Sequence, residues 1–295
     1  MRGFNSLKSI LSPIYTLDAK GKNILDIQKT FYFLLFKHGD LHHKYFYFIN
    51  MSNSLLFGKF AAVLPAGGLG KRMGGTIPKQ LMNLGNKPVY QYSLETFLNM
   101  DEIAEVVIAV PADWKDYFEK DIFSRLSSAF GTGYGNILNK LRIVVGGAER
   151  WQSVQNGVNA LTSGAEYVLV HDVARPFISE KIIRDVCETL INKGSCLVAK
   201  PAIDTIKIAS DGRVESTIDR NKVWLAQTPQ AARIDLLKSL YARIEKEPLN
   251  FTPTDEASIL EFFGEPVYIV KGESANDKLT TPEDFEIFVN RANQN

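Results

Sequence analysis

The chain has 295 residues and a formal net charge of +1, with 45% hydrophobic and 23% charged residues. These values are ordinary for a soluble globular protein, and the balanced charge argues against a dedicated nucleic-acid-binding protein. Cys187 and Cys196 form no Cys-x-x-Cys pair, which argues against a disulfide scaffold and against a zinc site. The apolar run 31–36 is far shorter than the roughly 18–20 residues that span a bilayer, so no transmembrane helix is predicted.

Residues 1–50 differ in composition from the rest of the chain. They carry seven Lys or Arg, three Asp and no Glu, together with ten aromatic residues and three of the four histidines. They show no helical or strand periodicity and lack the parts of a secretory signal. Three interpretations stay open: an organellar transit peptide, a partner-binding arm, or translation that begins at Met51. We favour the last and treat residues 1–57 as an irregular N-terminal extension.

From Phe60 onward, short apolar runs alternate with amphipathic stretches, a pattern that predicts β-α units and a mainly parallel sheet. In chain order the predicted strands are Phe60–Pro65, Ala104–Val110, Leu141–Val145, Tyr167–His171, Cys196–Ala202, Val223–Ala226 and Pro266–Val270. The predicted helices are Pro88–Met100, Trp114–Phe130, Glu149–Leu161, Glu180–Lys193, one that begins at Ile234, Asp255–Phe263, and one that begins at Pro282.

A polar segment interrupts this alternation. Residues 204–220, with the turn Ser210-Asp211-Gly212, are typical of a β-hairpin that reaches toward a second subunit or over a site. We therefore expect one Rossmann-like, three-layer α/β/α domain over residues 58–295, with an inserted hairpin arm at about 203–222.

The first predicted strand runs directly into a glycine-rich loop, Pro65-Ala66-Gly67-Gly68-Leu69-Gly70-Lys71-Arg72-Met73, and Pro78-Lys79-Gln80 follows. Glycines in this place let backbone N–H groups approach a nucleotide phosphate. The loop is not a Rossmann fingerprint, whose third glycine is Met73 here, nor a Walker A loop, because Arg72 follows Lys71. Arg72 and Lys79 are two positive charges able to surround a triphosphate, which suits phosphoryl or nucleotidyl transfer. Taken alone, such a turn is also common on protein surfaces.

This loop resembles the signature of the 2-C-methyl-D-erythritol 4-phosphate cytidylyltransferase family of the non-mevalonate isoprenoid pathway. Further blocks of the family follow in order: Gly146-Gly147-Ala148-Glu149-Arg150-Trp151-Gln152-Ser153-Val154, Val170-His171-Asp172-Val173-Ala174-Arg175-Pro176, Asp204-Thr205-Ile206-Lys207, Asp219-Arg220-Asn221 with Trp224, Gln227-Thr228-Pro229-Gln230, Thr254-Asp255-Glu256-Ala257-Ser258 and Asn276-Asp277-Lys278. The resemblance covers about residues 58–290.

The resemblance implies transfer of a cytidylyl group from CTP to 2-C-methyl-D-erythritol 4-phosphate, with release of pyrophosphate and with Mg²⁺ or another divalent cation on the triphosphate. It implies that four cations act in catalysis: Arg72, Lys79, Arg220 and Lys278. The CTP contacts that it implies are Pro65, Ala66, Gly67, Gly68, Gly70, Gly147 and Ser153. The contacts to the acceptor or its surroundings are Asp172, Arg175, Thr205 and Thr228, and Asp172 is also a candidate metal ligand.

The family pattern also implies a homodimer, in which the arm with Thr205 and Arg220 crosses to the neighbouring site. His171 is expected to be a packed strand-end residue and not a base, because a phosphate nucleophile is already ionised near neutral pH. Asp255 and Glu256 follow a good N-cap and are explained equally well as favourable first-turn charge. One departure from the family is Ala148, where some members carry an acidic residue, so a side-chain contact to cytosine is absent here.

Two other functions remain open at this stage. Ribitol or ribulose 5-phosphate cytidylyltransferases share the glycine loop, and a single sequence does not resolve two such similar acceptors. A non-catalytic nucleotide-binding regulator would have lost a catalytic cation, whereas Arg72, Lys79 and Lys278 are all present. We expect a cytoplasmic enzyme without nucleic-acid or membrane partners, or an organellar one if residues 1–50 are a transit peptide.

Overall fold

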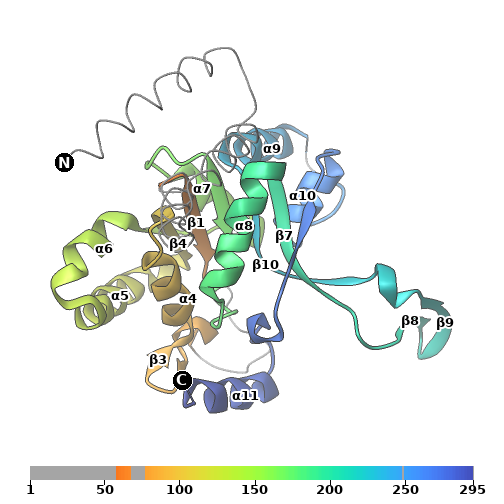
Figure 1. The fold of residues 1–295 in the computed structure, drawn as a ribbon, viewed down its shortest axis with the longest axis horizontal. Coiled ribbons are helices and arrows are strands. Elements are labelled where there is room, and N and C mark those ends of the chain that lie inside the picture. The colour runs from red at the N-terminus through yellow and green to blue at the C-terminus, as the bar shows by residue number, and fades with distance from the viewer. Residues whose placement is uncertain (1–57, 68–76, 248, 295) are drawn as a thin grey trace, which may run out of the picture. The chain divides into compact units, whose positions relative to one another are not determined.

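The computed structural model describes residues 58–67, 77–247 and 249–294. Within these residues, seven strands form one mixed sheet in the order β11-β7-β10-β6-β1-β4-β5 (Figure 1). In chain order these strands are β1 (Phe60–Pro65), β4 (Ile103–Val110), β5 (Leu141–Val145), β6 (Tyr167–Val170), β7 (Ser195–Pro201), β10 (Trp224–Arg233) and β11 (Tyr268–Lys271). Only β10 runs antiparallel to its neighbours in this sheet. The predicted α/β class with a mainly parallel sheet is therefore confirmed.

Helices cover both faces of the sheet, because alternate side chains of each central strand point to opposite sides. In β1, Ala62 and Leu64 join one apolar cluster and Val63 joins the other. The first cluster is covered by α4 (Val89–Leu98), α5 (Lys115–Phe130), α6 (Tyr134–Lys140) and α8 (Glu180–Lys193). The second is covered by α7 (Arg150–Asn159), α9 (Ile234–Lys246) and α10 (Glu256–Phe262). This arrangement is the expected three-layer domain.

A smaller apolar cluster lies beside these layers. Helix α11 (Pro282–Ala292) packs through Phe288 against Leu84 and Val89, next to the short hairpin of β2 (Asn83–Leu84) and β3 (Lys87–Pro88). Within the described part of the chain, no helix has the length and apolarity that a membrane span requires.

Several elements differ from the sequence prediction, which does not include the short strands β2 and β3. The sequence does not predict helix α6, because Gly131 and Gly133 precede it and Gly135 lies in its first turn. Strand β10 was expected to end at Ala226 but continues to Arg233. The polar block 227–230 with Pro229 predicts the end of a strand. In the structure this block forms an irregularity, where the pairing of β10 with β7 shifts register.

The expected hairpin is present as a separate two-stranded sheet of β8 (Ile206–Ser210) and β9 (Arg213–Ile218) (Figure 1). Asp211 and Gly212 at its tip both have positive φ, of 51° and 77°, as a two-residue turn of this kind requires. Every residue of β9 is exposed, and so are apolar side chains such as Ile203 at 79% and Val214 at 57%.

The topology brings several segments to one edge of the sheet. Strands β1, β4, β5 and β6 are parallel, so their carboxyl ends lie together. Because β10 is antiparallel, its irregular stretch at 227–229 lies beside the end of β6, where Gln230 pairs with Val170. The loop after β11 begins at the same edge, since β11 is parallel to β7. Ligands of open α/β sheets bind at this edge.

Candidate active site

The glycine loop begins where β1 ends, and the described part of it lies beside the start of α7. Ala66 donates its N–H to the carbonyl of Ala109, 2.7 Å away, which holds the strand end in place. A Cβ added to Gly67 would lie 3.5 Å from the hydroxyl of Ser153. Pro65, Ala66, Gly67 and Ser153 therefore lie in one region. Gly68, Gly70 and Arg72 lie outside the described residues.

Gly147 and Ser153 are joined directly. The Gly147 N–H donates to the Ser153 Oγ at 3.0 Å. A side chain on Gly147 would overlap the Cβ of Gln152, which belongs to the capping box that Glu149 and Gln152 form at the start of α7. Only glycine fits this turn, which carries backbone groups toward the edge of the sheet.

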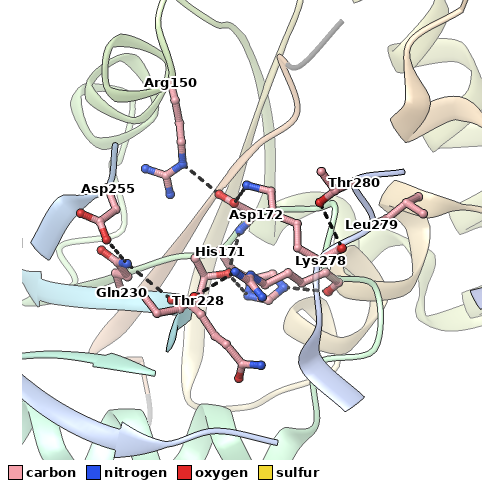
Figure 2. Close-up of polar contacts among 12 residues, drawn as sticks. Arg150, His171, Asp172, Thr228, Gln230, Asp255, Lys278, Leu279 and Thr280 are labelled. Carbon is pink, nitrogen blue, oxygen red and sulfur yellow. Dashed lines mark hydrogen bonds and ion pairs between the residues drawn. The ribbon is translucent and has the colours of Figure 1, made fainter. Parts of the chain in front are cut away.

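Asp172, two residues after the end of β6, lies at the centre of the site. Its Oδ1 accepts from the Arg150 Nε at 2.9 Å, and its Oδ2 accepts from the Lys278 Nζ at 2.6 Å. Figure 2 shows the two cations approaching the carboxylate from different sides. Burial alone would raise the pKa of Asp172, but the charges of Arg150 and Lys278 outweigh it and hold the pKa well below its usual range. The carboxylate is therefore ionised.

Buried hydrogen bonds hold the backbone of Asp172 in place. The Asp172 N–H donates to the Thr228 Oγ1 at 3.1 Å, and this hydroxyl lies 3.0 Å from the His171 Nδ1. The His171 Nε2 lies 3.0 Å from the carbonyl of Arg175, which only accepts, so Nε2 carries the ring proton and Nδ1 accepts from Thr228. Burial lowers the pKa of His171 to about 4. His171 is a neutral, packed residue.

Arg175 connects three segments of the site. Its guanidinium donates to the carbonyl of Asn276 at 2.9 Å and to the carbonyl of Ala226 at 3.2 Å. Its backbone N–H donates to the carbonyl of Asp172. Arg175 is buried, and its side chain bonds backbone carbonyls and not the Asp172 carboxylate.

Two of the predicted cations converge on the loop after β11. Lys278 binds Asp172 (Figure 2). The next residue, Leu279, accepts a hydrogen bond at its carbonyl from the Lys79 Nζ at 2.8 Å. The Leu279 N–H donates to the carbonyl of Ala174, which holds this loop beside the segment that follows β6. The structure thus brings Lys79, Asp172, Thr228 and Lys278 together.

The arm residues lie elsewhere in the single chain. Arg220 donates to the carbonyl of Ile203 at 2.7 Å, a contact within the arm, and both Arg220 and Thr205 are exposed.

The sequence does not predict the ion pair between Arg150 and Glu256. The Arg150 Nη1 lies 2.8 Å from the Glu256 Oε1 and 3.0 Å from Oε2, and Glu256 is buried at the start of α10. In the sequence, Arg150 stands out only as a member of the block 146–154 that resembles the family. The two residues are 106 positions apart, and no local pattern pairs them.

The described residues contain no group of three or more His, Cys, Asp or Glu that could hold a metal ion. Both oxygens of Asp172 already accept from cations. This donor set does not fit a metal held by Asp172. It fits an ion held by phosphate oxygens and water, as Mg²⁺ often is at nucleotide sites.

Comparisons with known proteins identify the family of the chain. The model of the 2-C-methyl-D-erythritol 4-phosphate cytidylyltransferase family matches residues 60–289. A curated relative of that name from Geobacter metallireducens is 38% identical over 227 residues, which are 76% of this chain and 93% of that protein. A chloroplastic relative from Oryza sativa subsp. japonica is 37% identical over 226 residues, 76% of this chain and 71% of that protein.

Solved structures give the same result. The 4-diphosphocytidyl-2C-methyl-D-erythritol synthase from Anaerococcus prevotii has a TM-score of 0.66 and 29% identity, over 81% of this chain and 97% of that chain. The 2-C-methyl-D-erythritol 4-phosphate cytidylyltransferase from Francisella tularensis has a TM-score of 0.62 and 29% identity, over 79% of this chain and 99% of that chain. Since the family model spans most of the chain, and the fold and the motifs agree with it, this chain belongs to the 2-C-methyl-D-erythritol 4-phosphate cytidylyltransferase family.

Proposed function

We propose that the chain transfers the cytidylyl group of CTP to 2-C-methyl-D-erythritol 4-phosphate and releases pyrophosphate. An oxygen of the acceptor phosphate attacks the α-phosphorus of CTP, and the bond from that phosphorus to the bridging oxygen of the β-phosphate breaks. The observation that carries the proposal is that Lys79 binds the carbonyl of Leu279, next to Lys278, which itself binds Asp172. Two phosphate anions repel each other, and convergent positive charge lowers the energy of their approach.

The residues divide the work in this proposal. Gly67, Gly147 and Ser153 receive the nucleotide, with Gly68, Gly70 and Arg72 completing the loop. Lys79 and Lys278 stabilise the charge that develops on the five-coordinate phosphorus. No general base is required, because the acceptor phosphate is already ionised near neutral pH. His171 is consistent with this, since both of its ring nitrogens are engaged by buried partners.

A divalent cation, usually Mg²⁺, would offset negative charge on the triphosphate. Phosphate oxygens and water would supply most of its ligands. In this proposal Asp172 acts through its ion pairs with Lys278 and Arg150.

The direct test is to incubate the purified protein with CTP, Mg²⁺ and each acceptor in turn, and to measure pyrophosphate. We expect release with 2-C-methyl-D-erythritol 4-phosphate. Release with ribitol 5-phosphate or ribulose 5-phosphate alone would replace the proposed acceptor, and binding of CTP without turnover on any acceptor would favour a non-catalytic regulator.

The arm supports a homodimer as the active form. It carries exposed apolar side chains and an arginine that is far better suited than lysine to bidentate phosphate binding. In this arrangement Arg220 and Thr205 of one subunit complete the acceptor site of the other.

Subunit mixing tests this arrangement. Arg220→Met and Lys278→Met homodimers should both be nearly inactive. After subunit exchange, each mixed dimer contains one intact site if Arg220 acts across the interface, so activity should return to about a quarter of wild type. Mixed dimers that co-purify through two tags but remain inactive would show that Arg220 acts in its own subunit.

For its location in the cell we keep the cytoplasm as the proposal, with an organelle as the alternative. The relative from Oryza sativa is chloroplastic, and residues 1–50 are rich in basic residues. Sequencing the N-terminus of the native protein decides between a retained leader, a cleaved leader and translation that begins at Met51.

A further inference from the structure

Four side chains of alternating charge form a continuous chain from the interior to the surface of the site. Glu256 binds Arg150, Arg150 binds Asp172, and Asp172 binds Lys278. They come from the start of α10, the start of α7, the end of β6 and the loop after β11. The Glu256 side chain is 1% exposed and the Lys278 side chain 41%, so the chain is closed at its acidic end and open at the lysine.

Stability alone does not explain this arrangement. Burying a carboxylate and a guanidinium carries a desolvation penalty that their attraction often only offsets, and apolar residues of similar volume are commonly as stable. The chain instead fixes the direction of each group. The Arg150 Nη1 contacts both oxygens of Glu256, which leaves Nε to meet the Asp172 Oδ1 at 2.9 Å. Oδ2 of the same carboxylate then faces Lys278.

Glu256 is itself held firmly. Asp255 caps α10 by accepting from the Ser258 N–H at 2.9 Å. The side-chain amide of Gln230, on β10, donates to Asp255 at 2.8 Å (Figure 2). The same amide accepts from the Ala257 N–H at 2.8 Å. These bonds tie the start of α10 to the strand that carries Thr228.

Asp172 is thus fixed from two directions. Its backbone N–H is held by Thr228, and its carboxylate is held by Arg150. We propose that Arg150 and Glu256 are positioning residues, which orient the Asp172 carboxylate so that it holds the Lys278 ammonium where the reacting phosphates meet. This inference rests on the proposed function, because it assigns Lys278 to phosphate.

The test compares Glu256→Gln with the matched control Glu102→Gln. Glu102 is also buried and also paired with an arginine, Arg184, at 3.0 Å, but it precedes β4 at the opposite edge of the sheet. We expect Glu256→Gln to lower kcat about tenfold or more, with less than about a threefold change in KM for CTP, because a misplaced group mainly affects the transition state. Glu102→Gln should change kcat by less than about twofold.

A double-mutant cycle shows whether Glu256 acts through Asp172. In an Asp172→Asn background the carboxylate no longer holds Lys278, so adding Glu256→Gln should change the remaining kcat by less than about twofold. An equal loss in both backgrounds, or an equal loss from Glu102→Gln, would overturn the positioning role.

If Glu256→Gln fails to fold, Arg150→Lys makes the same test. It keeps the charge but lacks the forked geometry that reaches two carboxylates at once, so it should also lower kcat about tenfold. Unchanged kcat in a folded Arg150→Lys protein would count against the role. Wild-type pyrophosphate release is the reference throughout: its absence counts against the proposed function, whereas an active wild type with unaffected variants counts against this inference alone.

Discussion

The ammonium of Lys79 donates a hydrogen bond to the main-chain carbonyl of Leu279, 200 residues later in the sequence and 2.8 Å away in space. This contact joins the segment after the glycine loop to the loop that carries Lys278. A segment near the start of the domain and one near its end therefore meet at the site.

Replacing Lys79 by methionine should remove one of the positive charges that are proposed to stabilise the transition state. We expect kcat to fall by about a hundredfold or more, in the range seen when one group that stabilises transition-state charge is lost. The free energy of unfolding should fall by no more than about 2 kcal/mol, the value of one charged hydrogen bond. Lys115→Met, at a partly exposed lysine paired with Glu119, is the control, and steady-state kinetics with thermal melts are the measurements. Similar kinetic losses in both variants would contradict a catalytic role for Lys79.

The turn before α7 should not accept a side chain. Gly147→Ala would place a methyl group against Gln152, so the turn must shift, and the KM for CTP should rise about tenfold or more. Gly135→Ala is the matched control, because a methyl group there meets open space within a helix and should be neutral or slightly stabilising. CTP titration of both variants measures the effect, and equal affinities would remove Gly147 from the nucleotide site.

The neutral state of His171 predicts how stability depends on pH. Burial lowers its pKa in the folded protein to about 4, below the usual value of about 6.5 in the unfolded chain. The unfolded chain then binds a proton first, so the contribution of His171 is complete above pH 6.5 and is lost as the pH falls toward 4. The full contribution of His171 to the free energy of unfolding is about 3 kcal/mol.

Urea unfolding at several pH values between 4 and 7 tests this prediction. His171→Asn cannot take up this proton, so the difference in stability between wild type and variant should shrink as the pH falls. A difference that stays constant over this range would contradict a neutral, buried His171.

The arm predicts an effect on one substrate only. Arg220→Lys should raise the KM for 2-C-methyl-D-erythritol 4-phosphate about tenfold and that for CTP less than about twofold, because lysine does not reproduce a bidentate phosphate contact. Arg213→Lys, on β9 of the same arm, is the control for a general effect of arm charge. Equal changes for both substrates would exclude a specific role of Arg220 at the acceptor.

Much of the fold follows from local patterns in the sequence. The apolar runs at 60–65, 104–110 and 141–145 became neighbouring parallel strands, and the turn at 210–212 became the tip of the arm. The sequence predicts that the strand before Pro229 ends at Ala226, because a proline in a polar block normally ends a strand. In the structure, a register shift in the sheet lets β10 continue past this proline.

The site could be predicted only where motifs carry it. Asp172, Thr228 and Lys278 belong to blocks that resemble the family, and the structure brings them together. The pairing of Arg150 with Glu256 depends on where α7 and α10 pack over the sheet, which no spacing along the chain encodes.

The arm leaves and re-enters the domain at adjacent points. Pro201 at the end of β7 is paired with Trp224 at the start of β10, and the Ala202 N–H donates to the Val223 carbonyl at 3.0 Å. Residues 203–222 thus extend from one antiparallel strand pair. A short turn between 202 and 223 would connect the two strands without them. In the proposed homodimer, such a shortened chain would lose the contacts of the arm and keep the seven-stranded sheet.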